Sequence, residues 1–359
     1  MTTLLPRPVQ KGRGAQSNAS GRYESLARET VYDGWALDDD APAPLRTTLT
    51  AETARVILTT NDSPDISFNQ SINPYRGCEH GCTYCYARPA HAYMGLSPGA
   101  DFESRLFFKP EAGRLLEREL SKPRYRVQNI QIGGNTDPYQ PAERKLGITR
   151  EVLEVLERFR HPFSIITKSQ AITRDLDILG PMGRAGLARA AVSVTTLDRR
   201  LARSMEPRAA TPERRLEAIK RLTEAGCPVT VMFAPVIPGL NDHELEAVLE
   251  RSAEAGAVNA GYVALRLPLE IKDLFREWLE GESPERARRV MSLVRQMRGG
   301  RDYDPEWRKR QTGGGPVAEL IARRFELACA RLGLNREWKP LDVTQFRVPE
   351  KAGDQMALL

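Results

Sequence analysis

The sequence lacks any long hydrophobic run. No window approaches the ~18 uninterrupted apolar residues that a membrane-spanning helix needs, although hydrophobic residues make up 41% of the 359-residue chain. The start of the chain, from Met1 to Arg7, also lacks the apolar stretch of a signal peptide. We therefore expect a cytoplasmic protein that has no membrane partner.

Lysine is scarce beside arginine, with 10 lysines and 43 arginines among the 53 basic residues. The formal net charge is +6, which is compatible with a polyanionic partner such as nucleic acid but does not require one. A solvated basic surface, in a chain that simply uses much arginine, explains the charge equally well.

Cysteine is scarce too, and its placement is uneven. Cys78, Cys82 and Cys85 lie close together, whereas Cys227 and Cys329 are far away. Five cysteines with this spacing are a poor disulfide framework. The cluster therefore indicates metal or redox chemistry. The two distant cysteines are expected to be buried structural thiols, because free cysteine packs as a small hydrophobe.

The chain divides into an irregular start and a regular core. Residues 1–65 are rich in Pro, Gly, Ser, Asp and Arg and predict an extended or disordered arm. From about residue 126, short apolar runs alternate with helical patterns. The expected strands are 127–132, 163–167, 191–195, 229–234 and 258–267, and the expected helices are 149–160, 174–188, 212–225, 242–255 and 268–280.

This alternation predicts a parallel α/β sheet with right-handed crossovers, and a full or partial barrel fits it best. Chemistry in such a barrel lies at the carboxyl ends of the strands. Residues 284–334 are expected to be helical with an interruption at 313–315, and the last 25 residues irregular. We expect three parts: the arm 1–65, a core 66–295 and an extension 296–359.

The three clustered cysteines have the spacing Cys-x3-Cys-x2-Cys. Thiolates at these positions can surround one iron–sulfur cluster. Zinc is the competing metal, but a structural zinc site needs four ligands, and the fourth could only be His80, His91 or a distant residue. Three thiolates on a four-iron cluster leave one iron without a protein ligand, and a catalytic centre needs such an open position.

The run NPYRGCEHGCTYCYA around these cysteines resembles the signature of the radical S-adenosylmethionine (SAM) superfamily. It is most similar to the bacterial branch called DNA-repair-photolyase-like, which is related to spore photoproduct lyase. The resemblance covers about residues 70–295. It implies a partial (βα)6 TIM-type barrel in which Cys78, Cys82 and Cys85 hold a [4Fe–4S] cluster that cleaves SAM to a 5′-deoxyadenosyl radical.

The same resemblance assigns contacts with SAM. Tyr84 stands where the family places an aromatic residue near adenine. The turn containing Gly133, Gly134, Thr136 and Asp137 resembles the glycine-rich turn that receives the methionine amino group. Glycines let the backbone approach closely, and Asp137 offers a negative charge to an ammonium group. A plain tight turn after a strand is the alternative.

Further along the chain, Lys168 resembles the lysine that meets the SAM carboxylate, and a solvated loop lysine is the alternative. Ser193, with Thr195 and Thr196, ends a strand and could contact the ribose or the carboxylate. Alternating Ser and Thr is also ordinary in a strand.

The run PVIPGLND at 235–242 resembles the Gly-x-Ile-x-Gly-x-x-Glu element beside adenine, in which Ile237 and Gly239 fit best. Asn241 and Asp242 could instead cap the next helix. Arg266, at a strand end, could bind a substrate anion or the SAM carboxylate, and a structural ion pair is equally plausible.

The resemblance leaves the reaction open. Spore photoproduct lyase returns hydrogen through a cysteine in its glycine-rich turn, and residues 133–136 contain none. Nucleic acid is the first-choice substrate, with a peptide, a tRNA or a small molecule as alternatives. An electron donor such as ferredoxin or flavodoxin is also implied. A zinc- or cluster-bearing binding module without catalysis is the alternative from another functional class.

Overall fold

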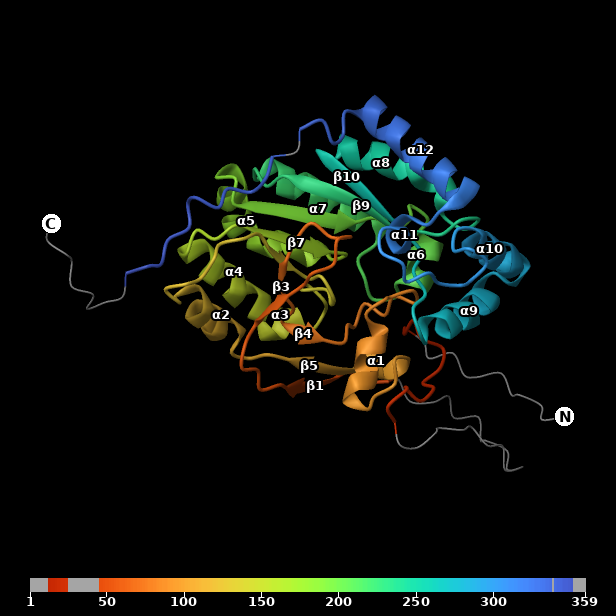
Figure 1. The fold of residues 1–359 in the computed structure, drawn as a ribbon, viewed down its shortest axis with the longest axis horizontal. Coiled ribbons are helices and arrows are strands. Elements are labelled where there is room, and N and C mark those ends of the chain that lie inside the picture. The colour runs from red at the N-terminus through yellow and green to blue at the C-terminus, as the bar shows by residue number, and fades with distance from the viewer. Residues whose placement is uncertain (1–11, 25–44, 338, 351–359) are drawn as a thin grey trace, which may run out of the picture.

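The computed structural model describes residues 12–24, 45–337 and 339–350. A seven-stranded sheet forms its centre, in the order β10-β9-β8-β7-β6-β3-β2 (Figure 1). The bounds are β2 Leu58–Thr60, β3 Gln70–Ile72, β6 Ile130–Ile132, β7 Phe163–Thr167, β8 Ala188–Ser193, β9 Val229–Val236 and β10 Asn259–Ala264. The six strands from β3 to β10 run parallel, and only β2 is antiparallel. This open sheet confirms the expected partial (βα)6 barrel.

Helices connect the parallel strands and pack against one another around the sheet. They are α2 Ala112–Leu120, α4 Ile148–Arg158, α5 Leu176–Arg184, α7 Pro212–Glu224 and α8 Leu245–Glu254. Their apolar residues recur at helical spacing, as in α4, where Ile148, Val152 and Leu156 are buried on one face. Buried strand residues such as Ile165 and Val231 complete the core.

The sequence located most of these elements, and the differences lie at their ends. Strand 163–167 is confirmed as β7. The expected helix 174–188 ends earlier, at Arg184, and the expected strand 191–195 begins earlier, at Ala188. Gly186 separates the two with φ +73°, a conformation that turns the chain out of the helix. A short 3₁₀ helix, η2 Gln170–Asp175, precedes α5.

Several short elements before residue 126 were not expected. β1 Thr48–Ala51, β5 Arg105–Phe108 and β4 Tyr75–Arg76 form a second, three-stranded sheet. The helices η1 Arg88–Met94 and α1 Ala100–Ser104 precede β5. Strands of two to four residues carry too few side chains to show a period of two, so the hydrophobic pattern does not predict them.

The expected arm is partly built into this fold. Residues 12–24 contain no helix or strand, in agreement with an extended arm, yet Arg13 and Ala15 are buried. Residues 45–65 supply β1 and β2. Residues 1–11 and 25–44 lie outside the described residues, and the domain boundaries near 65 and 295 stay predictions.

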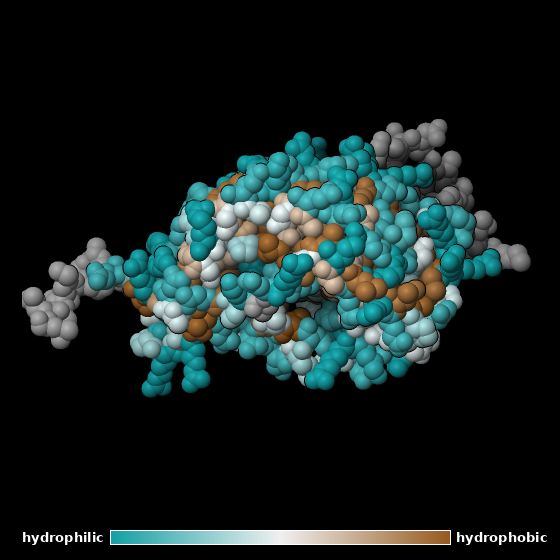
Figure 2. Space-filling view, turned by 90° about the horizontal axis from the view of Figure 1, so that it is seen from above, coloured by the Kyte–Doolittle hydropathy of each residue, from teal (hydrophilic) through white to brown (hydrophobic). Residues whose placement is uncertain are grey.

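The helical extension is confirmed with its interruption. Within residues 296–359 it contains α11 Lys309–Thr312 and α12 Gly315–Leu332, and residues 339–350 form no helix or strand. Before it, α9 Ile271–Glu282 and α10 Pro284–Gln296 lie at the end of the expected core. α12 packs along α8, where Arg324 binds the Glu246 carboxylate at 2.6 and 2.8 Å. The outer face of α12 exposes Leu320 and Leu327. Seen from above, the molecule is mostly hydrophilic with small, separate apolar areas (Figure 2).

No helix among the described residues is long and apolar enough to cross a membrane. The smaller elements α3 Glu143–Leu146, α6 Arg199–Met205 and η3 Asp242–Glu244 lie after β6, β8 and β9. Most of the residues that the sequence singled out lie in the loops that follow β4, β6, β7, β9 and β10.

Candidate cluster and cofactor site

The cysteine loop follows β3 and β4 at the carboxyl end of the sheet. Its entrance requires Gly77, which has φ +77° and whose added Cβ would lie 2.6 Å from Leu106 Cδ2. The amide of Cys78 then donates to the carbonyl of Phe102 at 3.0 Å. Cys78 and Cys82 are buried and Cys85 is half-buried. The fold therefore gathers the three thiols in one loop.

The surroundings of these thiols oppose negative charge. Burial, assisted by nearby Glu206, raises the pKa of Cys82 to about 12. Burial and Asp137 raise the pKa of Cys78, and Cys82 and Cys85 raise it further. Three mutually repelling thiolates need a compensating positive charge, which bound iron would supply. The donor set therefore fits an iron–sulfur cluster.

The zinc alternative finds no fourth ligand in the described part of the chain. There, no three His, Cys, Asp or Glu side chains converge as a single metal ion requires. His91 Nε2 instead lies 3.0 Å from the carbonyl of Arg105. His80 Nδ1 lies 3.2 Å from Asp137 Oδ2, although it is poorly aligned for a hydrogen bond. Both histidines therefore already lie against other groups of the protein, and the choice of a cluster over zinc stays a prediction.

The glycine-rich turn follows β6, beside the cysteine loop. Gly133 has φ +83°, and an added Cβ would lie 2.6 Å from Pro138 Cδ and 2.7 Å from the carbonyl of Ile166. Gly134 accepts a hydrogen bond from the Tyr86 hydroxyl through its carbonyl. Thr136 Oγ1 donates to the carbonyl of Tyr75 at 3.0 Å. The turn is tight, as the alternative interpretation expected, and its contact with the SAM amino group stays a prediction.

Asp137 connects this turn to the end of β7. Its Oδ1 accepts from Thr167 Oγ1 at 2.6 Å, and its Oδ2 accepts from the amide of Lys168 at 2.7 Å. Burial opposes its ionisation, but His80 and these hydrogen bonds outweigh burial and lower the pKa of Asp137 to about 2. Protein donors thus occupy both oxygens, and the expected contact with the SAM amino group stays a prediction.

Lys168 and Tyr84 lie together beside Cys82. Lys168 Nζ is 5.8 Å from the centre of the Tyr84 ring, within the range of a cation–π contact. Burial works against its charge, but Cys82 and Glu206 outweigh burial and raise the pKa of Lys168. Lys168 is half-buried beside the cysteine loop, and its expected contact with the SAM carboxylate stays a prediction.

A buried ionic network that the sequence did not predict supports this pair. The Tyr84 hydroxyl and Arg215 both donate to the Glu206 carboxylate. Thr195 Oγ1 donates to the same carboxylate at 2.7 Å, and Arg215 also donates to the carbonyl of Ser193 at 3.1 Å. Glu206 and Arg215 are at most 2% exposed. Arg215 could have been noticed, because it precedes Ile219 by four residues on the buried face of α7.

Ile237 and Gly239 lie in the turn after β9. Ile237 is fully buried, and its amide donates to Asn241 Oδ1 at 2.7 Å. Gly239 has φ +79°, and its amide donates to Asp242 Oδ1 at 2.7 Å. Asn241 makes no cap hydrogen bond to the following helix. Asn241 and Asp242 therefore hold the turn itself, and the alternative in which Asn241 caps the next helix is not observed.

Arg266 lies across from the cysteine loop. Its guanidinium carbon is 5.0 Å from the centre of the Tyr86 ring. Its Nε is buried and has no hydrogen-bond partner among the described residues. The structural ion pair expected as an alternative is not present in that part of the chain, so Arg266 keeps unused donors near the site.

Comparison with known proteins then decides the family. The model of the radical SAM superfamily matches residues 72–251. The chain belongs to the radical SAM superfamily. An uncharacterised protein of Mycobacterium tuberculosis is 35% identical over 232 residues, covering 64% of this chain and 68% of that protein. An uncharacterised protein of Methanocaldococcus jannaschii is 26% identical over 214 residues, covering 60% and 76%.

Solved structures agree with this radical SAM assignment. Spore photoproduct lyase complexed with dinucleoside spore photoproduct superposes with a TM-score of 0.57 at 14% identity, covering 80% of each chain. At this identity the likeness shows the fold alone. Radical SAM enzymes typically use a [4Fe–4S] cluster and SAM, and the cysteine loop is the part of this chain suited to the cluster.

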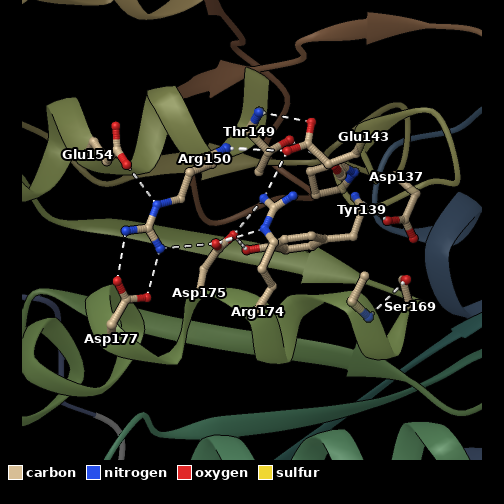
Figure 3. A network of polar contacts seen from close by, with 12 residues as sticks. Asp137, Tyr139, Glu143, Thr149, Arg150, Glu154, Ser169, Arg174, Asp175 and Asp177 are labelled. Atoms are coloured by element: carbon tan, nitrogen blue, oxygen red, sulfur yellow. Dashed lines mark hydrogen bonds and ion pairs between the residues drawn. The ribbon is translucent and has the colours of Figure 1, made fainter. Parts of the chain in front are cut away.

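A second polar network joins the segment that follows the glycine-rich turn to the residues after β7 (Figure 3). The Tyr139 hydroxyl donates to Asp175 Oδ2 at 2.9 Å. Arg174 lies between Glu143 and Asp175 and donates to both carboxylates at 2.9 Å. Arg150 extends the network from Asp175 outward to Asp177 and Glu154. The segment after β6 is therefore tied to η2 after β7, and Tyr139 has a structural partner.

Proposed function

We propose that this protein is a radical SAM enzyme in which Cys78, Cys82 and Cys85 hold a [4Fe–4S] cluster. The cluster and SAM, when bound, supply a 5′-deoxyadenosyl radical that abstracts a hydrogen atom from the substrate. The observation that carries this proposal is the gathering of three thiols and the charged Lys168 at the carboxyl end of the parallel sheet. Active sites of barrel enzymes are found at this end.

The chain's own residues would bind and orient SAM. Lys168, held charged beside Cys82, suits the SAM carboxylate. Gly133 and Gly134 let the backbone come close to the methionine moiety, with Thr136 and Asp137 behind them. Tyr84 and the turn of Ile237 and Gly239 would face adenine, with Ser193 at the ribose or carboxylate. Arg266 has a donor free for an anion of SAM or of the substrate.

The proposed substrate is nucleic acid. Support comes from the net charge of +6 and from the shared fold with spore photoproduct lyase, a protein solved with a dinucleoside photoproduct. The enzyme would need an electron donor such as ferredoxin or flavodoxin. The hydrogen donor must differ from a turn cysteine, because residues 133–136 contain none.

The experiment that tests the enzyme class is anaerobic reconstitution with iron and sulfide, followed by reduction, addition of SAM and quantification of 5′-deoxyadenosine. Cys82→Ala should abolish both the product and the brown colour. Cys227→Ala, which removes another buried thiol outside the loop, should retain both. A colourless protein with one tightly bound zinc and no SAM cleavage would support the binding-module alternative.

Substrate class is tested separately by binding. If nucleic acid is the substrate, affinity for DNA or RNA should fall steeply as salt rises, because each neutralised phosphate releases counterions. Absence of binding at low salt, together with SAM cleavage, would reject nucleic acid and leave a peptide or a small molecule.

A further inference from the structure

Residues 12–21 cross the cysteine loop at backbone contact distance. Gly14 has no Cβ, and one built there would lie 1.7 Å from the carbonyl oxygen of Gly81 and 3.3 Å from Thr83 Cγ2. Only glycine fits at such a distance. Next to it, Ala15 packs in one apolar cluster with Cys82 and Tyr84. This segment, which we call the strap, lies beside α1 in Figure 1, where it is coloured red.

A single buried carboxylate joins the strap to the cysteine loop. Glu103 is fully buried in α1, and its oxygens accept from the amide of Gly14 at 2.9 Å and from that of Ala15 at 2.7 Å. The same carboxylate pairs with the fully buried Arg88 at 2.5 Å. Arg88 Nε in turn donates to the carbonyl of Cys82 at 2.9 Å. Strap, carboxylate, guanidinium and cysteine backbone thus form one chain of contacts.

The strap is anchored on both sides of this contact. Arg13 donates to the backbone carbonyl of Glu103 at 2.7 Å and to that of Leu45 at 2.7 Å. Asn18 exchanges hydrogen bonds with Asp101 in α1. Burying a charged pair costs desolvation energy that well-packed apolar residues would not. We therefore assign the buried Glu103–Arg88 pair a role in orienting the backbone of the cysteine loop, and not in adding stability.

The cysteine loop needs such support because it contains no helix or strand between β4 and η1. Few backbone hydrogen bonds hold the loop internally, and one of them, from the amide of Gly81 to the carbonyl of Cys78, is long at 3.4 Å. A ligand loop without its own secondary structure takes its shape from its neighbours.

We propose that Glu103 is a positioning residue for the cluster loop and that the strap acts through Glu103 and Arg88 to keep that loop closed around the cluster. The inference rests on the proposed cluster, and the strap lies outside the region that the family model matches, which begins at residue 72. Opening the strap should expose the loop and speed the release of iron to a chelator.

The test compares two identical substitutions. Gly14→Ala places a Cβ against the carbonyl of Gly81, whereas Gly314→Ala meets nothing within 4 Å, and neither glycine has a positive φ. In the reconstituted full-length protein, Gly14→Ala should release iron to a chelator roughly tenfold faster than wild type, the equivalent of one lost charge-assisted hydrogen bond. Gly314→Ala should match wild type. Equal rates for both variants would overturn the proposal.

Hydrogen exchange of the cluster-free protein separates positioning from general destabilisation. Gly14→Ala and Glu103→Gln should speed exchange at the amides of residues 79–83 while those of β7 keep their protection. Uniformly faster exchange would mean a merely structural role, and unchanged exchange would exclude any coupling. Because this readout needs no cluster, a wild-type protein that fails to bind iron would reject the proposed function without deciding the strap.

Discussion

At the scale of single residues, buried charges hold the candidate site together. Glu206 accepts from Tyr84, Thr195 and Arg215 and is 2% exposed. Burial alone would keep it protonated, but Arg215 and Lys168 outweigh burial and lower the pKa of Glu206. The ionised carboxylate accepts hydrogen bonds from the hydroxyl of Tyr84 and the guanidinium of Arg215, so the positions of both groups depend on its negative charge.

Glu206→Gln should destabilise the protein by about 3 kcal/mol, because it leaves the Arg215 charge buried without a partner. A urea titration at pH 7 measures this. A depressed carboxylate pKa contributes stability above its unfolded value of 4.5 and loses it as pH falls, so the difference from wild type should shrink below about pH 4.5.

The matched control is Glu213→Gln, which removes an exposed carboxylate 3.6 Å from Arg199. Exposed pairs contribute less than about 1 kcal/mol. If Glu206→Gln lowers the free energy of unfolding no more than Glu213→Gln does, the assigned role of the network is contradicted.

At the scale of elements, the turn after β6 contains two neighbouring glycines that differ in the space around them. Gly133 has φ +83° and touches Pro138 and Ile166, so it has no room for a side chain. A Cβ built on Gly134 would meet only Phe68 at 3.7 Å and Gln131 at 3.9 Å, which are ordinary contact distances. The fold therefore requires a glycine at position 133, whereas position 134 has space for a methyl group.

Gly133→Ala should therefore lower the free energy of unfolding by about 2 kcal/mol through backbone strain and steric overlap. Gly134→Ala should change it by less than about 0.5 kcal/mol and reduce SAM affinity instead. Thermal unfolding, with and without SAM, distinguishes the two. Equal destabilisation by both substitutions would show that the turn is purely structural.

At the scale of the whole molecule, two buried histidines attach peripheral parts to the barrel. His91 packs against Phe102 and Phe107 of the smaller sheet and its helix. His161 contacts Phe346 near the end of the described chain, with ring centres 5.5 Å apart. Burial lowers the pKa of each histidine to about 4, so both are neutral in the folded protein.

Stability should consequently fall as pH drops from 6.5 toward 4, because the unfolded chain takes up protons there and the folded chain does not. The expected loss is about 2 kcal/mol for each histidine by pH 5. Urea titrations of the cluster-free protein at pH 7 and pH 5 measure it. His161→Gln should remove about half of this dependence, while His243→Gln, at an exposed position, should leave it unchanged.

The sequence by itself determined the repeating part of the fold and the identity of the candidate centre. Strand β7 and helix α7 were predicted almost to the residue, because their apolar periods are local properties of consecutive side chains. The cysteine spacing likewise needs only eight residues to be recognised. Strand ends were less accurate, since Gly186 and the pairing of β8 decide where that strand begins.

Tertiary structure alone decided what surrounds this centre. Glu103 meets Gly14 and Glu206 meets Tyr84 across 89 and 122 positions of sequence, and no local pattern records such pairs. The strap has a composition typical of disorder, yet the buried carboxylate of α1 satisfies its backbone amides. Contacts between distant residues form only when the whole chain has folded, and they therefore lie beyond what periodicity and spacing can predict.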